Sequence, residues 1–471
     1  MMPLDVLPAA GTVAGEGVRA LAVGALFLLV FSAAELWQRR GEPPVEWTRK
    51  LVHFGGGMIS ASLPWVFASH WTVLALGVLF AGIIWGTRRL GLLCSVHGVE
   101  RSSQGGIYFP IAVYLLFLLS AHQPVFYLIS LLVLVVADTV AAVLGSAYGR
   151  RMYAVESDRR SLEGSAVFFL TSFLCVHLPL LLLTEIEPAA SVVIALQLAL
   201  LVTFFEAISL RGSDNLIVPL VTYYLLVKMT PKSAEFIGLQ LLAQLAIIGV
   251  VALVVWRYRF VSLSGAVVIT LVLYGAFSLG GPAWLVAPAL ALAGFTALYR
   301  ALCRTDSQPD TRYQVIALFY VSLIGAALFV VNNAFATLVP DSFRLPVADP
   351  LYAPFVGVVA AQLALMFFTL LEPLGTRRRL ARLGGAPAAA AVGFLLVAPV
   401  GLWVGVEGIT LWGLAIAASI SFGGLLLFRA GRRLVGWPRQ APWSVRLQAA
   451  SVGMATLAVL PLHLWWIGGF W

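Results

Sequence analysis

Long apolar runs recur from one end of the chain to the other. The 471-residue sequence is 61% hydrophobic and only 11% charged, whereas soluble domains carry about 25% charged residues. A run of about 20 apolar residues is long enough to cross a bilayer as a helix. Lipid leaves only helices and closed barrels as spanning structures, and these runs are continuous rather than alternating. The sequence therefore predicts an all-α, polytopic integral membrane protein.

We expect about 16 transmembrane helices, counted as runs of sufficient length, in two halves. Loops before residue 256 mix acids, glycines and amides, whereas loops after it are mostly Arg, Pro and Gly. This shift predicts one membrane domain of residues 1–256 and a second of residues 257–471. The expected spans are approximately 17–37, 55–70, 72–86, 105–120, 124–145, 164–184, 188–207, 215–230, 236–256, 261–280, 283–300, 313–336, 351–371, 388–407, 409–428 and 447–467.

The distribution of basic residues predicts the orientation of these spans. If the N-terminus lies outside and the spans alternate, 26 of the 30 Lys and Arg residues fall on the inner side. The exceptions are Arg19, Lys228, Lys232 and Arg344. Cytosolic loops of membrane proteins carry such an excess of positive charge. The polar motifs described next are therefore expected on the cytosolic face, where nucleotides are found.

An aspartate stands inside one of the apolar runs. An acid at membrane depth costs about 2.5–3.5 kcal/mol even on lenient insertion scales. Asp138, Ala142, Gly145 and Gly149 are spaced by 4, 3 and 4 positions, so they share one face of a helix. Small residues on that face allow another helix or a ligand to approach closely. The pattern indicates a functional acid, and a helix-packing stripe with an incidental acid is the alternative.

The loop that follows carries groups suited to phosphate. Arg159 and Arg160 offer guanidinium donors, which match phosphate geometry. The segment from Ser161 to Ser165 opens the next span, and a helix start presents free amides and partial positive charge to an anion. The alternative is ordinary capping by Ser161 with Glu163 in the first turn.

A second group of acids is expected on the same face. Glu206 closes one span, and Asp214 and Asn215 open the next. Together with Asp138 they could hold Mg²⁺ between phosphate oxygens, because this ion takes hard oxygen ligands from one or two carboxylates, phosphate and water. The alternative is a turn with a capping aspartate.

Two further polar clusters are expected beside these residues. Arg49 and Lys50 precede a span, and His53 follows one turn later; Arg101 and Tyr108 flank a glycine turn before another span. A basic pair before a span is often a membrane anchor. His53 can instead line the site, and a purely structural histidine is the alternative.

Over about residues 45–230, the ordered set of motifs resembles the dolichol kinase and phytol kinase family. The set consists of Arg49-Lys50-x-x-His53, Gly105-x-x-Tyr108-Phe109-Pro110, Asp138-x-x-Ala141-x-x-x-Gly145-x-x-x-Gly149, Arg160-Ser161-x-Glu163-Gly164-Ser165, and Glu206 followed by Asp214-Asn215-x-x-x-Pro219. Members are membrane-embedded lipid kinases that use CTP. The family includes CTP-dependent diacylglycerol kinases and is related to the phosphatidate cytidylyltransferases. One departure is Arg160, where the family usually has lysine.

The resemblance implies a nucleotide site formed by Asp138, Gly145, Gly149, Arg160, Ser161, Glu163 and Gly164 and completed by Glu206, Asp214 and Asn215. We assign expected roles to these residues and to their polar neighbours. Asp138, Glu163 and Arg160 are expected to be catalytic, with Asp138 or Glu163 receiving the proton of the lipid hydroxyl. The remaining expected groups are nucleotide-binding Gly145, Gly149, Arg159, Ser161, Gly164, Ser165 and Asn215; metal-binding Asp138, Glu206 and Asp214; and Arg49, Lys50, His53, Arg101 and Tyr108 around the substrate.

The second half is similar to another membrane family, that of phytyl-phosphate kinase, over residues 257–370. The matching pieces are Ser262-Leu263-Ser264-Gly265-Ala266, Gly280-Gly281-x-x-Trp284 and Arg312-Tyr313-Gln314-Val315. That family has a helix bearing Asp and Glu in its presumed active region. The comparable stretch here, around Gln362, has no acid, so residues 257–471 are expected to be degenerate or scaffolding.

The expected function is CTP-dependent phosphorylation of a membrane isoprenoid alcohol of the phytol, geranylgeraniol or polyprenol (dolichol) type. Mg²⁺ is the expected cofactor, CTP the co-substrate and the bilayer the partner, with no role for nucleic acid. One alternative is a cytidylyltransferase acting on a lipid phosphate, or a diacylglycerol kinase. A membrane transporter is the alternative from another class. Transporters place their sites near the midplane between repeats, whereas these motifs cluster on one face.

Overall fold

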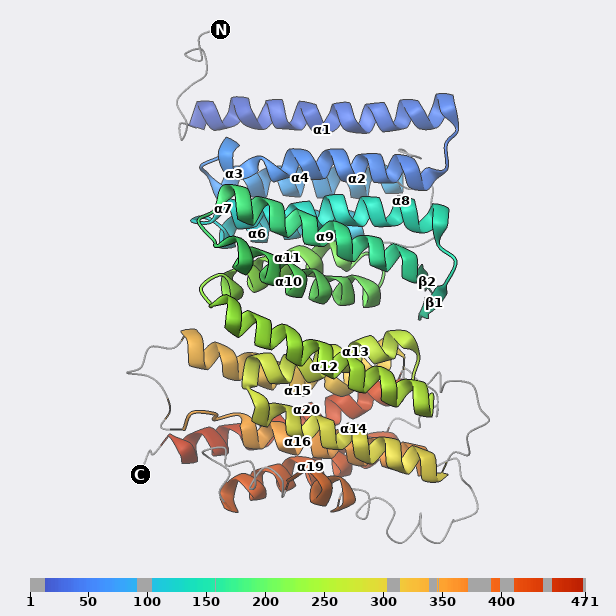
Figure 1. Ribbon diagram of the computed structural model, residues 1–471, viewed down its shortest axis with the longest axis vertical. Helices are drawn as coiled ribbons and strands as arrows, with labels where there is room; N and C mark the ends of the chain where they lie inside the picture. The colour runs from blue at the N-terminus through green and yellow to red at the C-terminus, as the bar shows by residue number, and fades with distance from the viewer. Residues whose placement is uncertain are drawn as a thin grey trace. The chain divides into compact units, whose positions relative to one another are not determined.

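The computed structural model describes residues 13–90, 104–156, 158–302, 314–338, 345, 347–371, 391–398, 411–434 and 443–468. In this part of the chain the structure is helical apart from one two-stranded hairpin (Figure 1), which confirms the all-α prediction. Twelve of the described helices are long and apolar enough to cross a membrane. Three more of the expected spans correspond to shorter helices: α2 has 17 residues, α6 has 15 and α11 has 16. The expected span 388–407 lies largely outside the described residues.

The chain divides into two compact units, Met1–Leu241 and Leu242–Trp471. The first contains α1 (Val13–Gly41), α2 (Val45–Ala61), α3 (Leu63–Val66), α4 (His70–Arg89), α6 (Gly105–Leu119), α7 (Pro124–Leu132), η2 (Val133–Ala137), α8 (Asp138–Tyr148), β1 (Met152–Val155), β2 (Asp158–Ser161), α9 (Leu162–Leu183), α10 (Pro188–Ile208) and α11 (Asp214–Met229). The division falls within α12 (Ala234–Tyr258), and the second unit continues with α13 (Leu263–Gly280), α14 (Pro282–Leu302), α15 (Val315–Leu338), α16 (Tyr352–Leu371), α19 (Leu411–Leu434) and α20 (Trp443–Ile467).

The span that carries Asp138 is one continuous helix interrupted by a π-helical segment. Helix α7 runs into the π-helical residues Val133–Ala137 (η2), and Asp138 is the first residue of α8. Such π-bulges are rare and occur frequently at functional sites. Here the π segment changes the helical register immediately before the acid.

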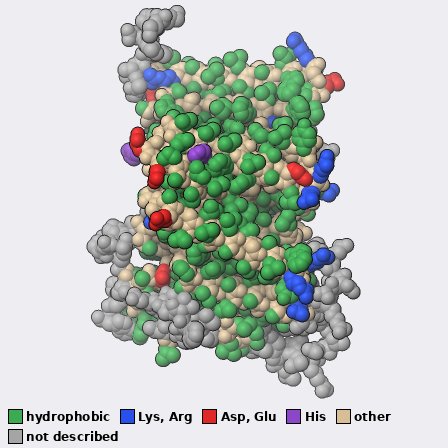
Figure 2. All heavy atoms as spheres, viewed as in Figure 1, with side chains coloured by type: hydrophobic (Ala, Val, Ile, Leu, Met, Phe, Trp, Pro, Cys, Tyr) green, Lys and Arg blue, Asp and Glu red, His purple; other side chains and the backbone are tan. Residues whose placement is uncertain are grey.

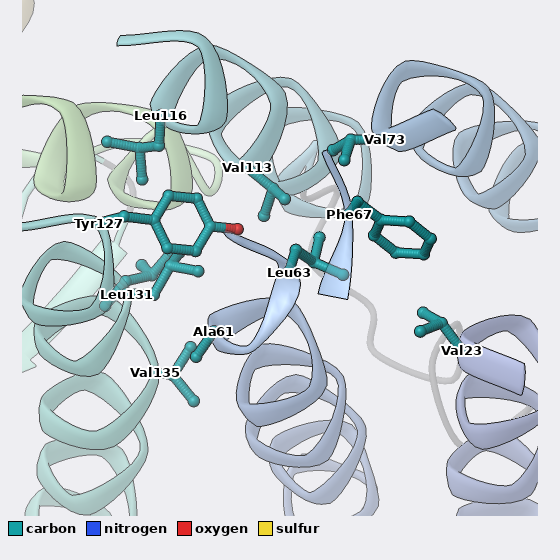
Figure 3. Close-up of a cluster of buried hydrophobic side chains, with 11 residues drawn as sticks. Val23, Ala61, Leu63, Phe67, Val73, Val113, Leu116, Tyr127, Leu131 and Val135 are labelled. Carbon is teal, nitrogen blue, oxygen red and sulfur yellow. The ribbon is translucent and has the colours of Figure 1, made fainter. Parts of the chain in front are cut away.

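A buried hydrophobic cluster joins the helices of the first unit at the end opposite the hairpin (Figures 1 and 3). Leu63 of α3, Leu116 of α6 and Leu131 of α7 belong to it, together with Tyr127. The hydroxyl of Tyr127 donates a hydrogen bond of 2.8 Å to the carbonyl of Ser60. The packing of this cluster holds α2, α6 and α7 together at the end of the first unit that lies away from the hairpin.

The hairpin connects α8 to α9. Strand β1 pairs antiparallel with β2, so that Tyr153 lies opposite Arg160 and Met152 opposite Ser161. Figure 2 shows Lys and Arg side chains gathered at this end of the first unit, beyond the apolar sides of its helices. The hairpin therefore places charged residues at the helix ends, outside the apolar layer.

Candidate active site

A cavity of about 510 Å³ opens at the charged end of the first unit. This volume lies in the range of sites for small molecules and cofactors. Thirteen of the expected site residues line it: Arg49, Lys50, His53, Asp138, Gly145, Arg159, Arg160, Ser161, Gly164, Ser165, Glu206, Asp214 and Asn215. Gly149, Glu163 and Tyr108 are not among its lining residues, and Arg101 lies outside the described residues.

Asp138 is held by two side chains of α2. Its Oδ2 accepts a hydrogen bond of 2.5 Å from Nζ of Lys50, which also lies 3.4 Å from the Asp138 carbonyl oxygen. Nε2 of His53 is 3.4 Å from the same Oδ2. Lys50 and His53 are three residues apart and therefore share one face of α2. The acid inside the span thus has a cationic partner, which offsets the cost of burying its charge.

His53 joins the polar and apolar parts of the cavity. Its Nε2 also lies 3.4 Å from the carbonyl oxygen of Leu134, within the π segment. Its ring packs edge-on to Phe109 of α6 at a centroid distance of 5.9 Å. A ligand polar group that reaches Asp138 therefore also meets an imidazole bordered by an aromatic ring.

Arg160 connects the hairpin to the end of α10. Its guanidinium forms an ion pair with Glu206, and Nη2 donates a 2.9 Å hydrogen bond to the carbonyl oxygen of Ser209. Both side chains of the pair are largely buried, with 17% and 14% of their surface exposed. The fork of arginine thus meets two acceptors at once, a geometry that lysine cannot reproduce.

Two side chains organise the start of α9. Ser161 is its N-cap, and its Oγ accepts a 3.1 Å hydrogen bond from the amide of Gly164. The carboxylate of Glu163 accepts hydrogen bonds of 3.1–3.2 Å from the amides of Arg150 and Arg151. Glu163 therefore fixes the turn that precedes the hairpin, and its role in catalysis stays a prediction.

The small residues of α8 bring that helix into close contact with the start of α9. A Cβ added at Gly145 would lie 3.1 Å from Cα of Gly164, and one at Gly149 would lie 2.7 Å from Oγ of Ser161. Gly145 and Gly164 also line the cavity. The stripe therefore packs helices and, by doing so, carries the N-terminus of α9 to the cavity.

The start of α11 reaches the cavity through a tight turn. Arg211 and Gly212 adopt positive φ angles of 52° and 84°, which are unusual for the arginine. The carbonyl oxygen of Arg211 accepts a 2.9 Å hydrogen bond from the amide of Gln104, next to α6. This turn directs Asp214 and Asn215 toward the same cavity as Asp138.

The carboxylates that line the cavity are of the kind that binds Mg²⁺ together with a phosphate group. Among the described residues, no three His, Cys, Asp or Glu side chains form a cluster that could hold a metal ion by themselves. Asp138 is paired with Lys50 and Glu206 with Arg160, while Asp214 lines the same cavity. Mg²⁺ is usually bound by one or two carboxylates together with substrate phosphates. Asp138, Glu206 and Asp214 all line the cavity, and their role as ligands of Mg²⁺ stays a prediction.

The cavity also contains residues that the motifs did not indicate. Glu46 and Trp47 line it from the first turn of α2, and Phe80 and Ile84 line it from α4. Glu46 precedes Lys50 by one helical turn, a spacing that places both on one face. Phe80 and Ile84 belong to an ordinary apolar run, in which the sequence does not distinguish cavity residues from buried ones.

In the second unit, the matching motifs have structural partners. Oγ of Ser262 caps α13 by accepting a 3.1 Å hydrogen bond from the amide of Gly265. Gly281 has a positive φ of 91° at the end of α13, and Gly280 leaves no room for a Cβ beside Trp284. Gln362 is buried in α16, which has no Asp or Glu. Arg312 lies outside the described residues.

Comparison with known proteins gives one informative match. No protein-family profile matches the chain, and no solved structure matches it. A phytol kinase of Synechocystis sp. is 35% identical to it over 206 residues, which cover 43% of this chain and 86% of the relative. Most of that relative is thus represented in less than half of this longer chain. At this identity and coverage, the chain belongs to the phytol kinase family.

Proposed function

We propose that this protein is a lipid kinase that transfers the γ-phosphoryl group of CTP to the hydroxyl of a phytol-type isoprenoid alcohol. The proposal rests on one observation above all: Asp138, with Lys50 and His53, lines the same cavity as the arginines of β2 and the start of α9. Charged and apolar surfaces meet there, as a reaction between a nucleotide and a lipid requires. The kinship to a phytol kinase supports an isoprenoid alcohol as the acceptor.

The cations of the cavity are suited to the phosphate chain. Arg49, Arg159 and Arg211 line it in addition to Arg160, and the capped N-terminus of α9 adds a partial positive charge. Phosphoryl transfer depends mainly on positioning and on stabilising charge on the transferred group. Because Arg160 is already bound to Glu206, we assign phosphate contact chiefly to Arg159 and Arg211, and a positioning role to Arg160.

The reaction forms a bond between the lipid oxygen and the γ-phosphorus and breaks the bond to the departing nucleoside diphosphate. We assign the orientation of the hydroxyl and the acceptance of its proton to Asp138 and His53, whose Oδ2 and Nε2 are 3.4 Å apart. Mg²⁺ bound with the nucleotide, through Asp138 and Asp214, would neutralise phosphate charge. We propose that this end of the first unit faces the cytosol, in keeping with the excess of basic residues.

We assign the chemistry to the first unit and a scaffolding role to residues 257–471. All of the described residues that line the cavity belong to the first unit. The helix comparable to the acidic helix of the second resembled family carries Gln362 and no acid.

Labelled nucleotides test the proposed reaction. Purified protein in mixed micelles is supplied with CTP, UTP, ATP or GTP. The lipids offered are prenol, geraniol, geranylgeraniol, phytol or diacylglycerol, and phosphatidate as the lipid phosphate. We expect γ-label from CTP to appear on an isoprenoid alcohol, and no transfer of α-label to lipid. Transfer of α-label to a lipid phosphate would instead indicate a cytidylyltransferase. Flux of a solute through proteoliposomes without nucleotide turnover would indicate a transporter.

Replacing Arg160 by lysine is expected to lower both stability and transfer. Lysine keeps the charge but cannot meet Glu206 and the Ser209 carbonyl as a fork, and a lost hydrogen bond to a charged group costs about 1.5–3 kcal/mol. The midpoint of thermal unfolding and the transfer rate are measured together. Arg159→Lys is the matched control, for which we expect an unchanged unfolding midpoint. Equal unfolding midpoints of the two variants would contradict the bridging role of Arg160.

A further inference from the structure

The cavity has two sides of different chemistry. Its charged side comes from the first half of α2, from α8 and β2, and from the helix ends around Glu206 and Asp214. Its other side comes from the second half of α2, from α4 and from α6, and bears no charge. We call this side the apolar wall; it consists of Gly56, Gly57, Phe80, Ile84, Gly106 and Phe109.

His53 stands at the border of the two sides. Its ring lies 5.9 Å from that of Phe109, centroid to centroid, and its Nε2 lies 3.4 Å from Oδ2 of Asp138. An alcohol whose hydroxyl reaches Asp138 therefore has its first carbons beside His53 and the apolar wall. Burying such carbons is favourable because it removes apolar surface from water.

The packing around the wall restricts where the rest of the chain can go. Phe109 packs against the buried cluster that includes Val113 and Tyr127 (Figure 3), so the end of the cavity toward that cluster is closed. Val135 fills the space beside Gly57. At Gly106, an added Cβ would lie 2.9 Å from Cγ2 of Ile84, so α4 and α6 form a continuous surface there.

Helix α4 offers a route to hydrocarbon beside α1, whose Phe27 and Phe31 rings pack against Phe80 at centroid distances of 5.2 and 5.5 Å. Beside the wall residues Phe80 and Ile84, it exposes the apolar side chains of Leu79 and Trp85, with 59% and 54% of their surface accessible. A single chain lying on the wall can continue along α4 into lipid without crossing the packed cluster.

We propose that the apolar wall binds the isoprene units nearest the hydroxyl, and that the chain leaves the cavity along α4 past Phe80 and Ile84. The inference rests on the proposed function and assigns the residues that select the alcohol. It implies that selection acts on the hydroxyl-proximal part of a single branched chain, while distal units lie in the bilayer.

Truncation of the wall tests this assignment. Phe80→Ala is expected to raise KM for geranylgeraniol and phytol about tenfold, the scale of effect for lost apolar contacts in a binding pocket, and to leave KM for the nucleotide unchanged. Prenol, whose single isoprene unit ends near His53, should be affected much less. Leu182→Ala removes an exposed apolar side chain of α9 that does not line the cavity, and it is expected to change nothing.

Equal losses for prenol and phytol, or equal effects of Phe80→Ala and Leu182→Ala, would overturn the wall as a selecting surface. Photo-crosslinking gives a readout that needs no turnover: a diazirine-bearing geranylgeraniol should label α4 and α6 in the wild-type protein. Label confined to other helices would overturn the proposal. If the wild type transfers γ-phosphate to no alcohol while the label still falls on α4 and α6, the proposed function fails and the binding surface stands.

Discussion

Replacing Asp138 by asparagine is expected to abolish transfer to the lipid alcohol while the protein remains folded. The carboxylate accepts a 2.5 Å hydrogen bond from Lys50 and lies 3.4 Å from Nε2 of His53. Asparagine keeps the shape and one acceptor oxygen but loses the charge. Removing a pre-organised electrostatic group from an active site typically slows turnover about 10²–10³-fold, and this variant also loses a ligand for phosphate-bound Mg²⁺. The rate of γ-label transfer and the unfolding midpoint are measured on the same preparation.

Two controls separate the role of Asp138 in the reaction from its role as the partner of Lys50. Glu187→Gln, before α10 and outside the residues that line the cavity, should behave as the wild type. The double variant Asp138→Asn/Lys50→Gln removes both charges of the pair. If the double variant regained activity, Asp138 would serve only to neutralise Lys50. Full activity of Asp138→Asn alone would contradict the active-site assignment.

Hydropathy was sufficient to predict the helical class, because the cost of unpaired backbone groups in lipid leaves few alternatives. It was less informative about helix ends. The expected span 55–70 corresponds to α2, which begins at Val45 and ends at Ala61. The first turns of α2 carry Glu46, Arg49 and Lys50, so an apolar count misses the part of the helix that lines the cavity.

Most of the polar cavity residues were predictable, because a polar group inside or beside an apolar run is costly unless it has a partner or a function. The ion pairs that these residues form could not be predicted. Arg160 and Glu206 form an ion pair across 46 positions, and Lys50 and Asp138 across 88. These pairs depend on how the helices pack, which no local pattern records. The sequence likewise indicates neither the π segment before Asp138 nor the difference between Phe80 and other apolar residues of α4.

Gly145 of α8 and Gly149 at the C-cap of that helix show the same limit, since their spacing is equally compatible with ligand contact and with helix packing. Gly149 is absent from the cavity lining, and an added Cβ there would lie 2.7 Å from both Cβ and Oγ of Ser161. Its φ and ψ of −65° and 118° are ordinary for any residue. The demand for glycine at this position is therefore steric rather than conformational.

Gly149→Ala is accordingly expected to destabilise the first unit by about 1–3 kcal/mol, the usual range for overpacking. The new methyl group would displace Ser161, whose Oγ caps α9 through the amide of Gly164, so nucleotide affinity should fall as well. Thermal unfolding and the KM for CTP measure the two effects. Gly82→Ala is the matched control, because nothing lies within 4 Å of a Cβ there and alanine stabilises a helix interior by about 0.5–1 kcal/mol relative to glycine.

A double-mutant cycle tests whether the new methyl group at residue 149 clashes with the side chain of Ser161. Ser161→Gly removes both side-chain atoms that the new methyl group would meet. In that background, Gly149→Ala should cost less than in the wild type, because contacting residues show coupling energies of about 0.5–3 kcal/mol. An equal cost in both backgrounds would mean that the backbone oxygen of Gly145, the other close neighbour, dominates. If Gly149→Ala were as stable as Gly82→Ala, the packing of α8 against α9 would not depend on the contact between Gly149 and Ser161. That contact would then not explain how the N-terminus of α9 is held beside the helix that carries Asp138.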